Sequence, residues 1–224
     1  MNYFMVKRLI LKDWYLHRRV ILGSIAAGIV TLGITVSGGT AAFILGIIAL
    51  VTVLIAVGAQ LATSTTVLER KEQTLAFVMS LPISYREYTA AKILGNLLIF
   101  LVPWLALVLG SFAIVMFVPG VPHGLLPFVA ILSTEILVST CLIVAVAVIS
   151  ESQGWTVGAI MMGSLTLNGF GYYVAHITGI ARGMYGPTIG WSTEATGLLL
   201  AEFAAIVLVL SLTFAVQARK KDFL

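Results

Sequence analysis

Long apolar runs alternate with short polar segments along the whole chain. Six of these runs are long enough, at about 20 residues each, to cross the roughly 30 Å hydrocarbon core of a membrane as helices. The predicted spans are residues 20–36, 41–62, 93–118, 125–149, 155–177 and 198–216. The pattern predicts an all-α polytopic membrane protein forming a single transmembrane domain, because a spanning segment must satisfy its backbone hydrogen bonds without water.

Composition agrees with this prediction. Hydrophobic residues make up 60% of the 224 and charged residues 10%, where a soluble domain has roughly 25% charged residues. The single cysteine, Cys141, excludes an intramolecular disulfide and a thiolate metal site. His17, His123 and His176 are far apart in the sequence, so no metal site is expected.

Lysines and arginines gather on one side of the predicted spans. Twelve of the 13 lie in residues 1–19, 68–92 and 219–224, and the opposite side holds only Arg182. The positive-inside rule then places both termini in the cytoplasm, which requires an even number of spans. Topology thus explains the net charge of +4, and no nucleic-acid partner is expected. A cleaved signal peptide over the first run is the alternative, which the long basic N-terminal region disfavours.

Residues 1–19 show the pattern of an interfacial amphipathic helix. Cations fall in one arc of a helical wheel and apolar residues fall mostly opposite, with Asp13 interrupting the apolar side. The cations are Lys7, Arg8, Lys12, Arg18 and Arg19, and the apolar set is Tyr3, Val6, Leu9, Ile10 and Trp14. We expect this helix to lie on the inner leaflet and contact anionic lipid, a basic tail being the alternative.

The segment 68–92 is more structured than a simple connection. Its first half places apolar residues at helical spacing, and Pro82 then interrupts the pattern. Ser84 and Glu87 form a capping box, which predicts a new helix that starts there and continues into the third span.

This segment resembles one found in the membrane subunits of type-2 ATP-binding-cassette (ABC) exporters. The matching residues are Glu69, Thr74, Ser80, Leu81, Pro82, Ile83, Ser84, Arg86 and Lys92. Gln73 stands where that family usually has a glycine, and Tyr85 precedes the arginine. The resemblance is close over the loop. Over the rest of the chain it extends only to the order of the predicted segments.

The resemblance implies that residues 69–84 are a coupling helix seated in a groove of a separate ATPase. The implied contact residues are Glu69, Glu72, Thr74, Leu75, Val78, Ser80, Leu81 and Pro82. It further implies two copies of that ATPase, which bind ATP and Mg, and a second six-span subunit, identical or related. The chain would lie in a bacterial or archaeal cytoplasmic membrane and export an amphipathic or hydrophobic solute.

The chain itself carries no sign of enzymatic chemistry. It lacks a Gly-x-x-x-x-Gly-Lys-Ser/Thr phosphate-binding loop, so no ATPase activity and no bound cofactor are expected. Ser164 and His176 would be about 18 Å apart on an unbroken helix, too far for a catalytic dyad. Glycines and Asn168 make continuous helix unexpected over 165–196, where exporters of this family often have a re-entrant hairpin.

Two carboxylates fall inside predicted spans. Glu135 lies ten residues into the fourth span, and Glu202 lies near the start of the last. Ionisable groups in lipid are costly and are functional candidates, so these two residues and Asn168 are candidates for a transport pathway. A protonated glutamic acid bonded to a neighbouring helix is the structural alternative. An ion-coupled carrier or channel using Glu135 is the alternative function.

Overall fold

The computed structural model describes residues 3–68 and 85–219, and every element in this part of the chain is helical. The elements are α1 (Tyr3–Val36), α2 (Thr40–Ala62), the π-helical η1 (Thr63–Leu68), α5 (Tyr85–Phe117), the 3-10 turn η2 (His123–Leu125), α6 (Leu126–Ser150), α7 (Gln153–His176), α8 (Thr178–Met184) and α9 (Thr193–Arg219). The all-α prediction is confirmed for the described residues.

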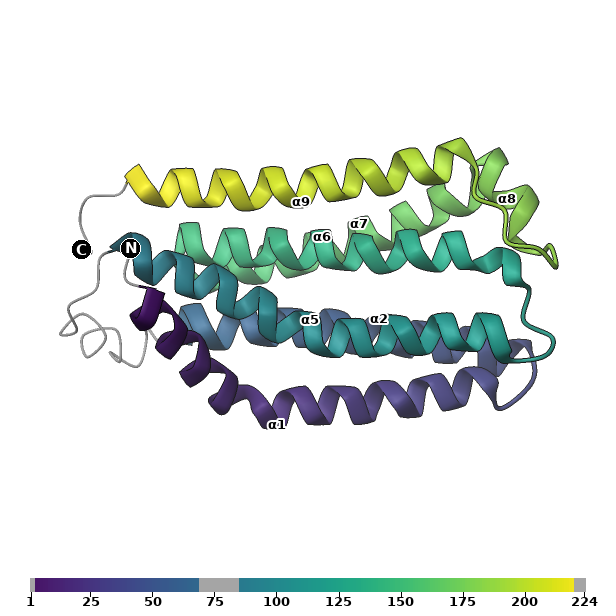
Figure 1. Ribbon diagram of the computed structural model, residues 1–224, viewed down its shortest axis with the longest axis horizontal. Helices are drawn as coiled ribbons and strands as arrows, with labels where there is room; N and C mark the ends of the chain where they lie inside the picture. The colour runs from purple at the N-terminus through teal and green to yellow at the C-terminus, as the bar shows by residue number, and fades with distance from the viewer. Residues whose placement is uncertain (1–2, 69–84, 220–224) are drawn as a thin grey trace.

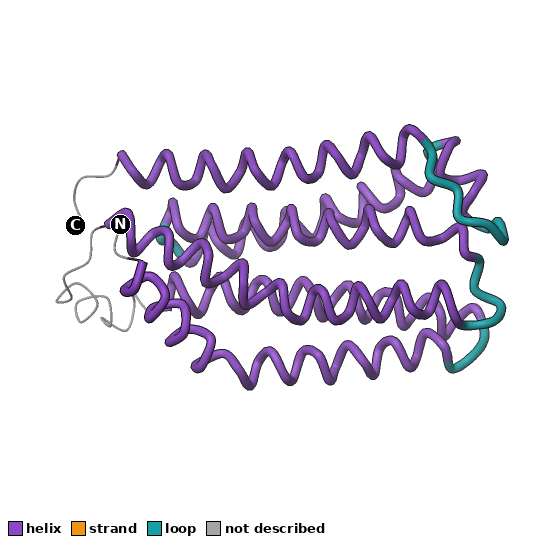
Figure 2. Tube along the Cα trace, in the orientation of Figure 1, coloured by secondary structure: helices purple, strands orange, loops and turns teal. Residues whose placement is uncertain are grey.

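The long helices run side by side along the length of the molecule, with α6 in the middle (Figure 1). Tyr3, Arg219 and the start of α5 lie at one end, which we call the termini end. The opposite end carries α8, and we call it the α8 end. Figure 2 shows the loops of the α8 end joining α1 to α2 and α5 to α6.

Five of the described helices are long and apolar enough to cross a membrane. They are Phe4–Val36, Thr40–Thr65, Glu87–Phe117, His123–Ser150 and Thr193–Arg219. This identifies an integral membrane protein of the helical class. The predicted span 155–177 corresponds to α7, which has 24 residues but is too rich in glycine and polar residues to belong to this group.

One expected division of the chain does not occur. The interfacial helix predicted over 1–19 and the span predicted over 20–36 form one continuous helix, α1, whose first turns are inclined to the rest (Figure 1). Residues 3–22 contain neither glycine nor proline, so nothing in this stretch interrupts the backbone hydrogen bonds.

The break expected within 165–196 lies at Ile177, between α7 and α8. Before it, α7 continues through Asn168 and two glycines. Each glycine costs about 1 kcal/mol relative to alanine in a helix. Burial of Leu167 and Val174 against the rest of the bundle offsets this cost.

The packed interior surrounds α6. In the 18-residue apolar stretch of α6, 67% of the residues are buried, against 17–33% in the corresponding stretches of the other four candidate spans. Phe100 from α5, Leu61 from α2 and Cys141 from α6 belong to one core cluster. The outer helices leave large apolar side chains exposed, as expected for surfaces that face lipid rather than water.

Glycine permits the close contact between α1 and α2. The turn joining the two helices uses Gly38 and Gly39 at φ values of 111° and 79°, where L-residues are strained. About two turns later, a Cβ added at Gly46 would lie 2.6 Å from the backbone nitrogen of Thr35 and 2.8 Å from its Cα. Since backbone atoms cannot rotate away, the two helices would have to separate.

We therefore expect Gly46→Ala to destabilise the α1–α2 pair by about 1–3 kcal/mol, the usual cost of overpacking. Gly33→Ala is the matched control, because a Cβ at Gly33 meets nothing within 4 Å. The measurement is thermal unfolding of the detergent-solubilised chain. Equal unfolding temperatures for the two variants would contradict the close approach at Gly46.

Candidate functional site

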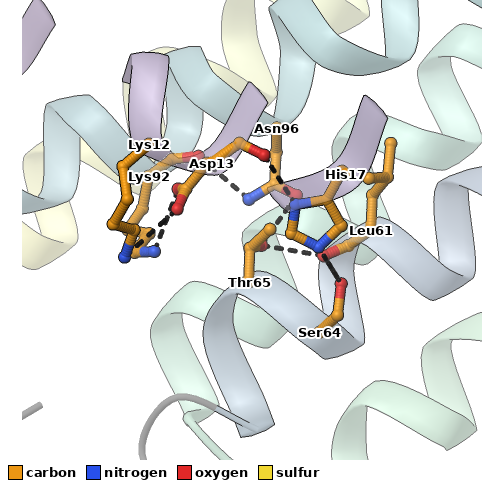
Figure 3. A network of polar contacts seen from close by, with 8 residues as sticks. All are labelled: Lys12, Asp13, His17, Leu61, Ser64, Thr65, Lys92 and Asn96. Carbon is orange, nitrogen blue, oxygen red and sulfur yellow. Dashed lines mark hydrogen bonds and ion pairs between the residues drawn. The ribbon is translucent and has the colours of Figure 1, made fainter. Parts of the chain in front are cut away.

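A cluster of polar side chains joins three elements at the termini end (Figure 3). We call it the termini-end cluster, and it consists of Asp13 and His17 from α1, Ser64 and Thr65 from η1, and Lys92 and Asn96 from α5. The residues come from segments far apart in the sequence. Two of the three elements, η1 and α5, directly flank residues 69–84.

The strongest contact of the termini-end cluster is a buried ion pair. Lys92 Nζ donates to Asp13 Oδ2 at 3.1 Å, and both side chains are 3% exposed. Lys12 Nζ lies 3.3 Å from the other carboxylate oxygen, so Asp13 faces two cations. A buried charge is tolerated only when it is paired, so each partner fixes the other in place.

A second branch links α5 to the end of α2. Asn96 Nδ2 donates to the carbonyl of Lys92 at 2.9 Å, which turns its Oδ1 toward Thr65. The Thr65 hydroxyl lies 2.9 Å from this Oδ1 and 2.8 Å from the carbonyl of Leu61, and its one proton is shared between these acceptors. Both side chains are buried, so the branch is shielded from solvent.

His17 forms the third branch. Its Nδ1 lies 2.8 Å from the Asp13 carbonyl, which can only accept, so Nδ1 is the donor. Its Nε2 lies 2.8 Å from the Ser64 hydroxyl, and in a neutral ring this nitrogen accepts. The imidazole therefore bridges α1 and η1.

Apolar packing brings the first part of α1 onto α5. Val6 and Leu9 are buried against Ala91, with Tyr88 beside them. Asp13 follows Leu9 by four residues, so it lies on the same face one turn further along. The amphipathic pattern found in the sequence thus packs its apolar side partly against protein.

The pairing of Asp13 with Lys92 was not predicted from the sequence. Asp13 is expected there only to interrupt an apolar face, and Lys92 is noted only as part of the family pattern. The available signal was an isolated acid on the apolar side of a basic helix. Such an acid needs a cation from another segment when that side is buried.

Residues implied to contact an ATPase lie outside the described part of the chain. They are Glu69, Glu72, Thr74, Leu75, Val78, Ser80, Leu81 and Pro82. The helix predicted to continue from this segment into the third span is present, because α5 (Tyr85–Phe117) is unbroken. The Ser84 cap itself also lies outside the described residues.

The candidate pathway residues separate into two groups. Glu135 on α6 and Glu202 on α9 lie on helices that pack against each other, since Ile131 of α6 shares a cluster with Ala195 and Leu198 of α9. Asn168 is exposed on α7 and donates to the Ser164 carbonyl of its own helix at 2.7 Å. The structure therefore places the two carboxylates on neighbouring helices and Asn168 on the outside of the bundle.

A cavity of about 640 Å³ opens at the α8 end among α1, α2, α5 and α6. Its lining is mainly apolar, with polar side chains contributed by Thr35, Thr40, Ser111, Ser133 and Tyr185. The size and composition are those of sites that hold small apolar molecules.

Other combinations considered from the sequence do not meet. Because α7 is continuous, Ser164 and His176 are separated by about 18 Å of helix rise. Their side chains bond to the carbonyls of Ile160 and Tyr172 on the same helix. Within residues 3–68 and 85–219, no three His, Cys, Asp or Glu side chains are grouped as a metal site would require.

The fold and these sites describe a helical integral membrane protein with a polar cluster at one end and an apolar cavity at the other. Neither a protein-family model, nor a curated protein, nor a solved structure matches this chain. Any assignment to a family therefore depends on the loop resemblance and on the geometry described above.

A double-mutant cycle tests the buried ion pair. We expect Asp13→Ala or Lys92→Met alone to lower the free energy of unfolding by about 3–5 kcal/mol, because each removes one partner of a buried ion pair. The double variant should lose less than the sum of the two, with a coupling of about 0.5–3 kcal/mol.

The control is Lys12→Met, which removes a cation that is 39% exposed and should cost no more than about 1 kcal/mol. The measurement is denaturant unfolding in detergent micelles. Additive effects of Asp13→Ala and Lys92→Met would contradict the ion pair.

Proposed function

We propose that this chain is the membrane-spanning subunit of an ABC exporter. A separate ATPase, present in two copies, supplies the energy by binding ATP and Mg and docking on residues 69–84. A second membrane subunit, identical or related, completes the transporter. The proposal depends on one observation, the termini-end cluster. This cluster joins η1 and α5, the two elements that flank residues 69–84, to α1.

A coupling segment can move the spans only if the elements at its two ends are held firmly to the bundle. The termini-end cluster supports the proposal because it holds these elements. Leu68 ends η1 and Tyr85 begins α5, so a force on residues 69–84 acts on both elements. The contacts of Thr65 with Asn96, of Asp13 with Lys92 and of His17 with Ser64 join those elements to each other and to α1. A displacement at the termini end is thereby shared by three helices.

The cavity supports the proposed chemical class of the exported solute. It lies at the α8 end, remote from the segment that would receive the ATPase, and its lining offers dispersion contacts with few hydrogen-bonding groups. An amphipathic or hydrophobic solute would be suited to it. Six spans and cytoplasmic termini belong to this proposal, with α7 as the sixth span.

One observation favours a different function. Glu202 is 5% exposed, and neither of its carboxylate oxygens has a hydrogen-bond partner in the described residues. An intramembrane carboxyl group beside Glu135 would serve an ion-coupled carrier or a channel. That alternative needs no ATPase, so partner binding separates the two functions.

Cysteine labelling in whole cells tests the topology. In a Cys141→Ser background, a cysteine at position 85 should react only with a membrane-permeant reagent. A cysteine at position 182 should also react with an impermeant one, because Arg182 is exposed on α8 at the opposite end from Tyr85 (Figure 1). Labelling of position 182 only from the cytoplasm would overturn the proposed orientation.

Substitution in the loop tests the ATPase contact. Val78→Glu places a carboxylate on the apolar side of the predicted coupling helix. An unpaired charge buried at an interface costs about 2–5 kcal/mol, so ATPase binding should fall by more than tenfold. The measurements are co-purification of an ATPase from the native membrane and ATP-dependent export.

Arg182→Ala is the control, because it changes an exposed residue at the α8 end. Both variants should insert into the membrane to the same extent as the native chain. If Val78→Glu retains the ATPase and export as fully as the control does, residues 69–84 are only a connection and the proposed function is wrong.

A further inference from the structure

α7 has one face in the bundle and another on its outside. Leu167 and Val174 are buried in the clusters that contain Ile136 and Ile131 of α6, so this side of α7 packs on the centre of the bundle. The helix runs beside α6, which is a candidate span, so both helices lie at membrane depth (Figure 1). The other side of α7 is exposed over most of its length.

Residues on this outer side recur at alternating intervals of four and three positions, and we call them the α7 stripe. These intervals are those of the a and d positions of a heptad, the pattern by which two helices pack side by side. The stripe extends over about 27 Å of helix rise, close to the thickness of a hydrocarbon core of about 30 Å. Its members are exposed apart from the half-buried Gly158, and they are Gly154, Gly158, Met161, Leu165, Asn168 and Tyr172.

Asn168 brings an amide group into the α7 stripe at a depth where lipid would surround it. It lies eight residues, or about 12 Å of helix rise, from His176 at the end of α7, which is about 36 Å long. One of its two N–H groups donates to the Ser164 carbonyl at 2.7 Å. The other N–H and the Oδ1 atom have no hydrogen-bond partner among the described residues. Both groups would be costly to expose to hydrocarbon, so a partner from outside the chain is expected.

Other outer surfaces at this depth are suited to lipid. The large exposed side chains of α9 there are apolar, such as Leu200 and Phe203. Thr52 is an exposed polar residue of α2, but its hydroxyl donates to a carbonyl of its own helix. The α7 stripe also differs in its glycine, because a Cβ added at Gly158 meets nothing within 4 Å. Packing within the chain does not require a small residue there, whereas close approach of a second helix would.

We propose that the α7 stripe is the contact between two copies of this chain, whose α7 helices pack in parallel about a two-fold axis along the membrane normal. The free N–H of Asn168 in each copy donates to Oδ1 of Asn168 in the other. The inference rests on the part of the proposed function that requires a second membrane subunit, and it identifies that subunit as an identical chain. It requires no ATPase.

A second copy fits the α7 stripe because an amide group is complementary to itself. It carries both a donor and an acceptor, and a two-fold axis along the membrane normal brings the same residue of both copies to the same depth. Lipid tails offer neither a donor nor an acceptor. A single polar residue in an otherwise apolar heptad pattern fixes the register of the two helices, which is the position that Asn168 has here.

Disulfide cross-linking of the full chain in native membranes tests the geometry. In a Cys141→Ser background, oxidation of Leu165→Cys should give covalent dimers, because the two-fold axis passes beside this position. Thr166→Cys is the matched control, since Thr166 is also exposed and lies at nearly the same depth but points away from the stripe. A disulfide requires Cα atoms closer than about 7 Å, so the control should form several-fold less dimer.

Energy transfer between fluorescently labelled full chains in lipid vesicles measures the affinity of the pair. Asn168→Leu should raise the dissociation constant about tenfold, because it removes two hydrogen bonds between the copies. Thr166→Leu, on the same helix outside the stripe, should leave it unchanged. Gly158→Leu should weaken the pair while the unfolding temperature of the chain stays at the native value, a combination that a role within one chain would not produce.

Several results would overturn the proposal. Equal cross-linking of Leu165→Cys and Thr166→Cys would place the contact elsewhere, and native affinity in Asn168→Leu would remove the role of the amide. Chains that stay monomeric in vesicles would show that lipid covers the stripe. The proposed function is tested separately by ATPase binding, and it would survive each of these results with a related chain as the second subunit.

Discussion

Hydrogen bonding without water is the constraint on which the rest of this structure depends. The spanning helices satisfy their own backbones, and hydroxyls such as Thr31, Thr140 and Thr213 donate to carbonyls of the preceding turn. Polar groups that cannot be satisfied locally need a partner from another helix. Gln217, buried at the end of α9, donates to the Val148 carbonyl of α6 in this way.

The two charged features of the bundle follow from this constraint in opposite ways. At the termini end, Asp13 and Lys92 neutralise each other and stabilise a contact between α1 and α5. Within the bundle, Glu202 is buried and neither of its carboxylate oxygens has a hydrogen-bond partner among the described residues. The constraint is met by a partner from another helix in the first case and is left unmet in the second.

Much of the fold was predictable because apolar length and charge placement act locally. The all-α class, the long apolar helices and the continuous helix that runs from Tyr85 into the third span were predicted from the sequence and are confirmed in the described residues. The separate interfacial helix was wrong, because residues 3–22 contain no glycine or proline that would end the helix before the apolar run.

The sequence by itself determined that this is a helical membrane protein, because crossing a lipid bilayer requires long apolar segments. It also determined which carboxylates lie within the apolar helices, because an acidic residue is rare in such a segment. Tertiary structure alone decided which residues meet. Asp13 and Lys92 are 79 positions apart, and Gln217 and Val148, which join α9 to α6, are 69 positions apart. Hydropathy along one helix carries no information about the helix packed against it, so these pairings required the assembled bundle.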